Sequence, residues 1–278
     1  MKMTTLSTPT NNIFLGTSGW GQKVDKSEAY RIVEMFYDKK YRWVDTSTNY
    51  PIDGKPENYG QTVLWLAEFC EDFPELKIYC KVGSASNLGD ATQLINSSYL
   101  ALIFDLLYDR FNVCLGGIGI HWDAEVMEFD RTDVIHYFQD LHEKGYAIGL
   151  SGIQEPQNYN SSATGRNLPW ILQTNVSPVR ASQVIDDIDS SRNAFPKGKI
   201  YGYNVLGGIN AKGIPKQFDR LTFLSKILRG NQNSGTDSEM QYVLDYINAL
   251  NIDGIVLGPT TVEQCLNWFS IIDRLYHE

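Results

Sequence analysis

The sequence predicts an α/β protein folded as one (β/α)8 barrel, and three observations support this fold. Short apolar runs alternate with amphipathic stretches along the whole 278-residue chain. The runs are almost continuously hydrophobic, as in parallel strands that are covered on both faces. Polar, ionisable side chains follow the apolar residues of three runs, where α/β barrels carry their active sites. We therefore expect one barrel domain over residues 1–278, with a short N-terminal extension and no long C-terminal loop.

The apolar runs have the length of ordinary strands and end at turn-forming or ionisable residues. They predict strands over Ile13–Thr17, Arg42–Thr46, Lys77–Val82, Gly117–His121, Ala147–Ser151, Trp170–Thr174, Lys199–Tyr203 and Gly254–Gly258.

Apolar residues at helical spacing predict helices between these strands. In Lys26–Lys40, Ile32 and Phe36 lie on one face, and Asp25 precedes the segment as a candidate N-cap. Other helices are expected over Asn58–Cys70, Ala91–Phe111, Thr132–Lys144, Glu239–Leu250 and Thr261–Tyr276 and, with weaker periodicity, over Gln154–Gly165 and Ala181–Asn193. Asn204–Ser234 is longer than an ordinary loop and contains a possible helix, Lys216–Leu228, so we expect it to cover a ligand.

The composition predicts a cytoplasmic enzyme. A formal charge of −9 argues against general binding to nucleic acid or anionic membranes, which needs clustered basic residues. The four cysteines are widely spaced without a CxxC pair, which predicts reduced core thiols and no metal centre. No apolar run resembles a signal peptide or reaches the length of a membrane span. The oligomeric state stays open.

Four residues carry the candidate chemistry, namely Asp45, Tyr50, Lys81 and His121. Each has an ordinary structural alternative, since an Asp at a strand end often caps a helix and a His is often a satisfied core residue. A buried Lys81, however, needs an anion, and Asp45 is available. Together an acid, a phenol, an ammonium and an imidazole at strand ends predict a site that moves protons.

The order of these residues resembles the aldo-keto reductase family. Asp45-Thr46-Ser47-Thr48-Asn49-Tyr50, followed by Glu57 and Gly60, is similar to the family's Asp-Thr-Ala signature with its Tyr. Lys81 and His121 match the next two motifs in order. Downstream similarities lie at 16–21, 149–152, 173–175, 203–208 and 258–264. The resemblance covers nearly the whole chain, and its specificity lies in the ordered set.

This resemblance implies an NAD(P)(H)-dependent oxidoreductase that transfers hydride between a nicotinamide and a small-molecule carbonyl or alcohol. Tyr50 would be the general acid and base. Lys81 would lower the pKa of Tyr50, Asp45 would hold Lys81, and His121 would donate a hydrogen bond that orients the carbonyl.

The resemblance also implies the residues that bind cofactor and substrate. The cofactor set is Thr17, Ser18, Ser151, Gln173, Tyr203, Leu206, Gly207, Lys212, Gly258, Thr260, Thr261 and Gln264. Tyr203 would stack on the nicotinamide, while Ser151 and Gln173 would hold its carboxamide. Trp20 and Trp122 are candidate substrate contacts, with packing at the barrel mouth as an equal alternative. NADP(H) is favoured over NAD(H), although Thr260-Thr261 lacks the cation that family members often place there.

The chain departs from the family pattern in ways that keep two other functions open. Pro51 follows Tyr50 in place of Gly, and Gly152 replaces an expected Asn. One alternative is a catalytically altered homologue that binds nucleotide as a regulatory or structural protein. The other is a lyase or epimerase that uses the same Tyr, Lys and His for proton transfer without net redox chemistry.

Overall fold

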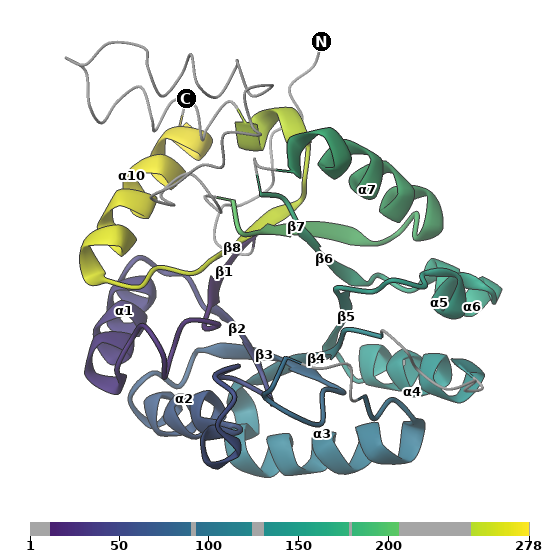
Figure 1. Cartoon of the computed structure of the whole chain (residues 1–278), viewed down its shortest axis with the longest axis horizontal. Helices are drawn as coiled ribbons and strands as arrows, with labels where there is room; N and C mark the ends of the chain where they lie inside the picture. Colours follow the sequence, from purple (N-terminus) through teal and green to yellow (C-terminus); the bar gives the residue numbers. More distant parts are fainter. Residues whose placement is uncertain (1–11, 90–92, 124–130, 178–179, 206–245, 278) are drawn as a thin grey trace.

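Eight parallel strands form a closed barrel, β1 to β8 in sequence order, in a computed structural model that describes residues 12–89, 93–123, 131–177, 180–205 and 246–277. The predicted (β/α)8 fold is confirmed, and Figure 1 shows the helices as a layer outside the strands. The strands are β1 (Ile13–Gly16), β2 (Trp43–Ser47), β3 (Lys77–Val82), β4 (Leu115–His121), β5 (Ala147–Ser151), β6 (Ile171–Asn175), β7 (Lys199–Tyr203) and β8 (Gly254–Leu257). Each lies within two residues of its predicted position.

The helices follow the predicted order, and Asp25 caps the first of them by accepting a hydrogen bond from the Glu28 backbone N–H at 2.9 Å. They are α1 (Lys26–Asp38), η2 (Pro56–Asn58), α2 (Gln61–Asp72), α3 (Ser97–Phe111), η3 (Asn112–Cys114), α4 (Arg131–Glu143), α5 (Gln157–Asn160), α6 (Ala163–Asn167), α7 (Ala181–Ala194) and α10 (Val262–His277). Of the predicted helix Glu239–Leu250, residues 246–250 are described and helical, whereas its start and Lys216–Leu228 lie outside the described residues.

Three predicted helices begin at least three residues later than expected. The segment predicted over Gln154–Gly165 becomes helical only at Gln157 and forms two short helices, α5 and α6. The segment predicted from Ala91 becomes helical only at Ser97, because the Asn96 side chain caps the helix there by accepting the Tyr99 N–H at 2.9 Å. The segment predicted from Asn58 divides at Gly60, whose φ of 76° is left-handed and separates η2 from α2.

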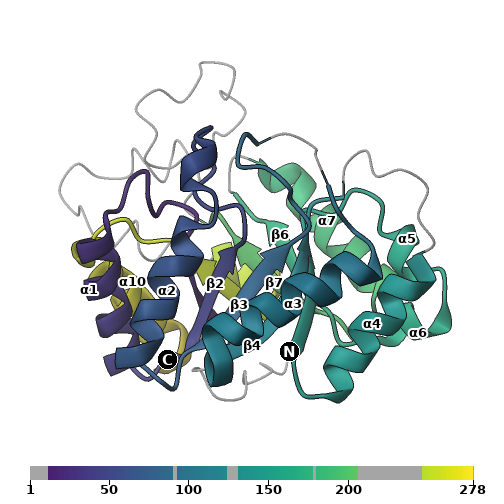
Figure 2. The same cartoon turned by 90° about the horizontal axis from the view of Figure 1, so that it is seen from below.

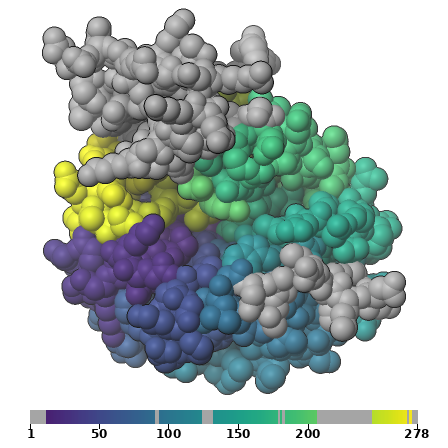
Figure 3. All heavy atoms as spheres, viewed as in Figure 1, coloured from purple at the N-terminus to yellow at the C-terminus, as the bar shows by residue number. Residues whose placement is uncertain are grey.

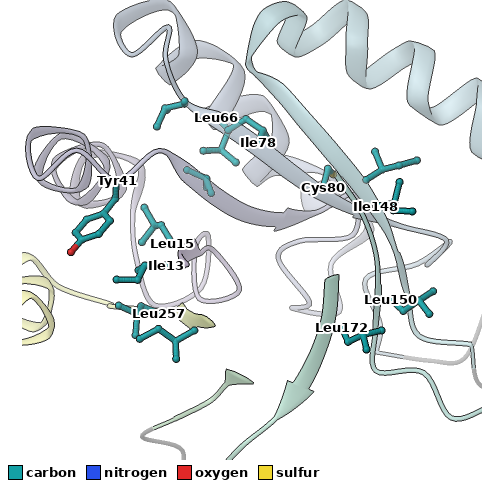
Figure 4. Close-up of a cluster of buried hydrophobic side chains, with 14 of the residues drawn as sticks. Ile13, Leu15, Tyr41, Leu66, Ile78, Cys80, Ile148, Leu150, Leu172 and Leu257 are labelled. Carbon is teal, nitrogen blue, oxygen red and sulfur yellow. The ribbon is translucent and has the colours of Figure 1, made fainter. Parts of the chain in front are cut away.

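Side chains alternate between two buried layers along each strand. One set, including Ile13, Leu15, Ile78 and Leu257, packs outward against the helices (Figure 4). The other set fills the barrel and includes Phe14, Tyr79, Ile171, Tyr201 and Val256. The two-residue period of a strand therefore decides which residues can reach the interior.

The barrel closes where the two ends of the described chain meet. β1 pairs with β8 in parallel register, with Leu15 opposite Leu257. In the space-filling view the purple α1 and the yellow α10 lie side by side (Figure 3). In the side view α3 lies in front of β3 and β4, with α2 beside it (Figure 2). Among the helices that the structure describes, none combines the length and apolarity needed to cross a bilayer.

Candidate active site

The alternation along the strands brings the predicted catalytic residues into the barrel at one end. Lys81 follows the interior residue Tyr79 by two positions and pairs with Ser47 on β2. His121 ends β4 and pairs with Ser151 on β5. Because all eight strands are parallel, these carboxyl-terminal positions share one face of the barrel.

Asp45 and Lys81 form a buried ion pair. The Lys81 ammonium donates to Oδ2 of Asp45, and the two residues are only 2% and 4% exposed, Lys81 and Asp45 respectively. The second carboxylate oxygen, Oδ1, accepts a hydrogen bond from Nε2 of Gln173 at 2.6 Å. Burial alone would lower the pKa of Lys81, but the Asp45 carboxylate and, once it is deprotonated, Tyr50 raise the pKa by more, so the ammonium keeps its charge.

Tyr50 lies beside this pair and beside His121. Its ring centroid is 5.3 Å from Nζ of Lys81 and 5.7 Å from the His121 ring, which it meets edge-on at 85°. Burial raises the pKa of Tyr50, and the Lys81 charge offsets part of that rise. The phenol is therefore protonated near neutral pH, as a proton donor must be.

His121 is buried in a polar shell made by two residues of the β2 end. Its Nδ1 lies 2.9 Å from Oγ of Ser47 and 3.2 Å from Oδ1 of Asn49. Burial lowers the pKa of His121 well below 6.5, and the Lys81 charge lowers it further. The imidazole is therefore neutral at physiological pH.

Trp122 covers one face of the His121 ring. The two rings stack with centroids 4.0 Å apart and planes at 27°. The indole occupies the space beside Gly152, where an added Cβ would lie 2.5 Å from Cδ1 of Trp122. Gly152 also has a φ of 66°, so the departure from the family's Asn has a local steric reason.

The predicted carboxamide site lies at the ends of β5 to β7. Ser151 pairs with Gln173 in the sheet, and Asn175 pairs with Tyr203, so these strands bring the three predicted cofactor residues Ser151, Gln173 and Tyr203 to one arc. The Gln173 amide is already engaged with Asp45. The Tyr203 ring is partly buried and packs against the aromatic cluster inside the barrel.

The predicted adenosine end is a compact turn at the start of α10. Thr260 donates to Oε1 of Gln264 from its N–H at 2.8 Å and from its hydroxyl at 3.0 Å. The Thr261 hydroxyl accepts the Gln264 N–H at 3.1 Å. Oε1 of Glu28, which forms an ion pair with Arg31, accepts the Val262 N–H at 2.7 Å. A carboxylate thus already lies at the positive end of α10.

The remaining predicted residues differ in their surroundings. Ser18 and Gly258 are exposed in the loops after β1 and β8. The Thr17 hydroxyl is fully buried and bonds to Thr46 and the Asp45 carbonyl, which indicates a structural contact between β1 and β2. Trp20 is fully buried beside Phe69, which favours the packing interpretation. Leu206, Gly207 and Lys212 lie outside the described residues.

Sequence reasoning missed four roles at this site. It assigned Gln173 only to a cofactor and overlooked its bond to Asp45. It gave no role to Ser47 and Asn49, although both lie inside the Asp45–Tyr50 motif, where polar residues at a strand end are a usable signal. Glu28 carries no local signal, because it reaches α10 only through the closure of the barrel.

Comparison with known proteins agrees with this geometry. The profile of the Aldo/keto reductase family matches residues 12–191, well over half of the chain. The search among curated protein sequences found no match to this chain. Among solved structures, a candidate aldo-keto reductase from Pseudomonas aeruginosa matches with a TM-score of 0.59 at 14% identity, over 96% of this chain and 90% of that one. That likeness shows the barrel fold. The family match, over a closed barrel with Asp45, Tyr50, Lys81 and His121 gathered at one end, places this chain in the aldo-keto reductase family.

Proposed function

We propose that the protein is an NAD(P)(H)-dependent carbonyl reductase or alcohol dehydrogenase in which Tyr50 is the general acid and base. The observation that carries the proposal is the position of the buried Tyr50 ring, whose centroid lies 5.3 Å from Nζ of Lys81, itself paired with Asp45. Family membership supports an oxidoreductase that uses a nicotinamide cofactor. The substrate would be a small carbonyl or alcohol.

The chain's residues supply the proton chemistry for such a reaction. Reduction of a carbonyl leaves an alkoxide that must be protonated, and Tyr50 is the buried acid in position to do so. The Lys81 ammonium, held by Asp45, stabilises the tyrosinate that remains. In the reverse direction the same tyrosinate accepts the alcohol proton.

The residues at the ends of β5 to β7 fit a nicotinamide. When bound, that group supplies or accepts the hydride. Tyr203 is partly exposed, and Ser151 has a hydroxyl that makes no hydrogen bond within the described residues. These two would position the ring and its carboxamide, while the Gln173 amide is shared with Asp45.

The choice between NADP(H) and NAD(H) would depend on the turn at Thr260. The sequence favoured NADP(H), with its 2′-phosphate near this turn. The Glu28 carboxylate at the start of α10 repels a dianion there and shifts the preference toward NAD(H). Thr260 and Thr261 contribute hydroxyl groups but no positive charge.

The test is Tyr50→Phe, assayed with both dinucleotides across a panel of aldehydes, ketones and alcohols. Loss of the acid is expected to lower kcat by about 10²-fold or more, while binding of the dinucleotide, followed by calorimetry, stays unchanged. Tyr79→Phe is the matched control, because the Tyr79 hydroxyl is buried in the same barrel without a hydrogen-bond partner among the described residues.

Three other outcomes would contradict this mechanism or favour one of the two alternative functions. Full turnover in Tyr50→Phe contradicts the proposed mechanism. Tight dinucleotide binding without turnover of any substrate favours a regulatory or structural homologue. Failure to bind either dinucleotide favours proton transfer without redox chemistry, as in a lyase or epimerase.

A further inference from the structure

The polar shell around His121 contains enough hydrogen-bond partners to decide which ring nitrogen carries the proton. Ser47 and Asn49 are fully buried, and His121 is 4% exposed. A neutral imidazole has one N–H donor and one bare nitrogen acceptor, and its neighbours select between the two forms.

The orientation of the Asn49 amide is set by its outer partner. Nδ2 of Asn49 donates to the Ser86 carbonyl oxygen at 3.2 Å. Exchanging the amide atoms would bring two oxygen acceptors together at that contact. Oδ1 of Asn49 therefore faces inward, toward Ser47 and His121, and it can only accept.

The Ser47 hydroxyl cannot serve every acceptor around it. Its oxygen lies 2.6 Å from Oδ1 of Asn49 and 3.0 Å from the Lys81 carbonyl, which also accepts the Thr48 N–H at 2.9 Å. The hydroxyl has one hydrogen. Because the contact with Oδ1 of Asn49 is the shortest, the hydroxyl donates that hydrogen to Asn49. If Nδ1 of His121 were bare, it would be a third acceptor around that single hydrogen, at 3.2 Å from Oδ1.

A proton on Nδ1 resolves these contacts. The Nδ1–H group then donates to Oγ of Ser47 at 2.9 Å and toward Oδ1 of Asn49, while Ser47 donates to Asn49. The contacts among His121, Ser47 and Asn49 then each contain a hydrogen, and the Lys81 carbonyl keeps the Thr48 N–H as its donor. With a bare Nδ1, two acceptors, Nδ1 of His121 and Oδ1 of Asn49, would instead face each other in the buried shell without a hydrogen between them, which costs free energy.

We infer that Ser47 and Asn49 are positioning residues that hold His121 as the Nδ1–H tautomer, so that Nε2 presents a lone pair to the site and accepts a hydrogen bond from a hydroxyl group of the ligand. Within the described residues Nε2 has no other hydrogen-bond partner. The ligand class is therefore one with an O–H at this point, such as the alcohol form of the substrate. The ligand assignment rests on the proposed function, whereas the tautomer does not. It reverses the expectation that His121 donates to a carbonyl.

The tautomer is measured directly by long-range 1H–15N correlation NMR, without dinucleotide or substrate. Replacing His136, His142 and His277 by Gln leaves His121 as the sole histidine of the chain's four. The spectrum is recorded at about pH 8, above the usual imidazole pKa of about 6.5. A pyrrole-type Nδ1 and a pyridine-type Nε2 are expected. The opposite pattern overturns the inference and leaves the role of Tyr50 to its own assay.

Variants of the shell test the two positioning residues. Ser47→Ala with Asn49→Leu removes both acceptors, so the ratio of the tautomers should move by about tenfold or more toward Nε2–H. Asn49→Asp keeps an acceptor and should keep Nδ1–H, which a merely structural role does not predict. Retention of Nδ1–H in the Ala/Leu variant contradicts the role of the shell. If that variant does not fold, Nε2–H in Asn49→Asp contradicts it instead.

Discussion

Gln173 on β6 donates a hydrogen bond from Nε2 to Oδ1 of Asp45 on β2, at 2.6 Å and across 128 positions of sequence. The two strands are opposite one another in the ring of eight, so the bond crosses the barrel interior. Asp45 thus accepts from Lys81 with one oxygen and from Gln173 with the other. The Asp45 carboxylate that binds Lys81 is therefore itself positioned by a residue on the opposite side of the barrel.

Gln173→Leu should show how much that hydrogen bond contributes to the free energy of unfolding. The change leaves Oδ1 of a buried carboxylate without its donor, so the free energy of unfolding is expected to fall by about 1–3 kcal/mol. Urea unfolding followed by circular dichroism measures it. Gln183→Leu, at an exposed site on α7, is the matched control and should change stability little. Equal effects at the two sites would contradict the importance of the bond.

Asp45 and Lys81 should be strongly coupled in a double-mutant cycle. Asp45→Asn leaves a buried ammonium unpaired and is expected to destabilise the fold by about 3–5 kcal/mol. Lys81→Met leaves the carboxylate with Gln173 alone. The double variant removes both charges, so its loss of unfolding free energy should be clearly smaller than the sum of the single losses. Additive losses would show that the ion pair contributes no coupling.

Gly152→Ala should disturb the indole that covers His121. The new methyl group would lie 2.5 Å from Cδ1 of Trp122, at a φ of 66°. Overpacking and backbone strain together are expected to cost about 2–4 kcal/mol. Gly54→Ala is the matched control, since its φ is 73° and nothing lies within 4 Å of the added Cβ. It therefore carries the backbone cost alone, and thermal unfolding of both variants separates the two contributions.

Glu28→Gln should change the discrimination between the two dinucleotides. The amide oxygen can still accept the Val262 N–H, but the negative charge at the start of α10 is gone. If the 2′-phosphate binds at this turn, the Kd for NADPH should fall by about 2- to 5-fold, in line with a helix-end charge effect of 0.3–1 kcal/mol. The Kd for NADH should stay unchanged. Equal shifts for both cofactors in a fluorescence titration would place the 2′-phosphate elsewhere.

His121 should make the stability of the fold depend on pH in the acid range. Because its pKa is lowered well below 6.5 in the folded protein, the unfolded chain takes up a proton on this residue before the folded chain does. Stability from this source is therefore complete above about pH 6.5 and is lost as the pH falls toward the folded pKa, by up to about 1.4 kcal/mol per pH unit.

The difference in unfolding free energy between the wild type and His121→Asn isolates this contribution. Urea unfolding at several values between about pH 5 and 7.5 should show the wild-type advantage shrinking as the pH falls. His136→Gln, at an exposed position on α4, is the control for the loss of a histidine. A wild-type advantage that grows toward acid pH would mean that the folded site stabilises the imidazolium.

The order of strands and helices and the four candidate catalytic residues were available from the sequence. Buried parallel strands need continuous apolar runs, and a break into ionisable residues marks their ends, as at Lys81 and His121. Local caps could also be predicted, as for Asp25, because the cap and its N–H partner are three positions apart. The start of α3 was missed because the competing Asn96 cap lies within a run that continues the helical pattern.

Only the tertiary structure decided which side chains contact one another at the site. Gln173 reaches Asp45, Glu28 caps α10, and Ser47 with Asn49 encloses the Nδ1 edge of His121. These contacts join residues between 72 and 234 positions apart in the sequence. Apolar periodicity determines which face a side chain takes, because it is a property of neighbouring positions. Hydrogen-bond partners across a closed barrel depend on register and curvature, which appear only when all eight strands have closed.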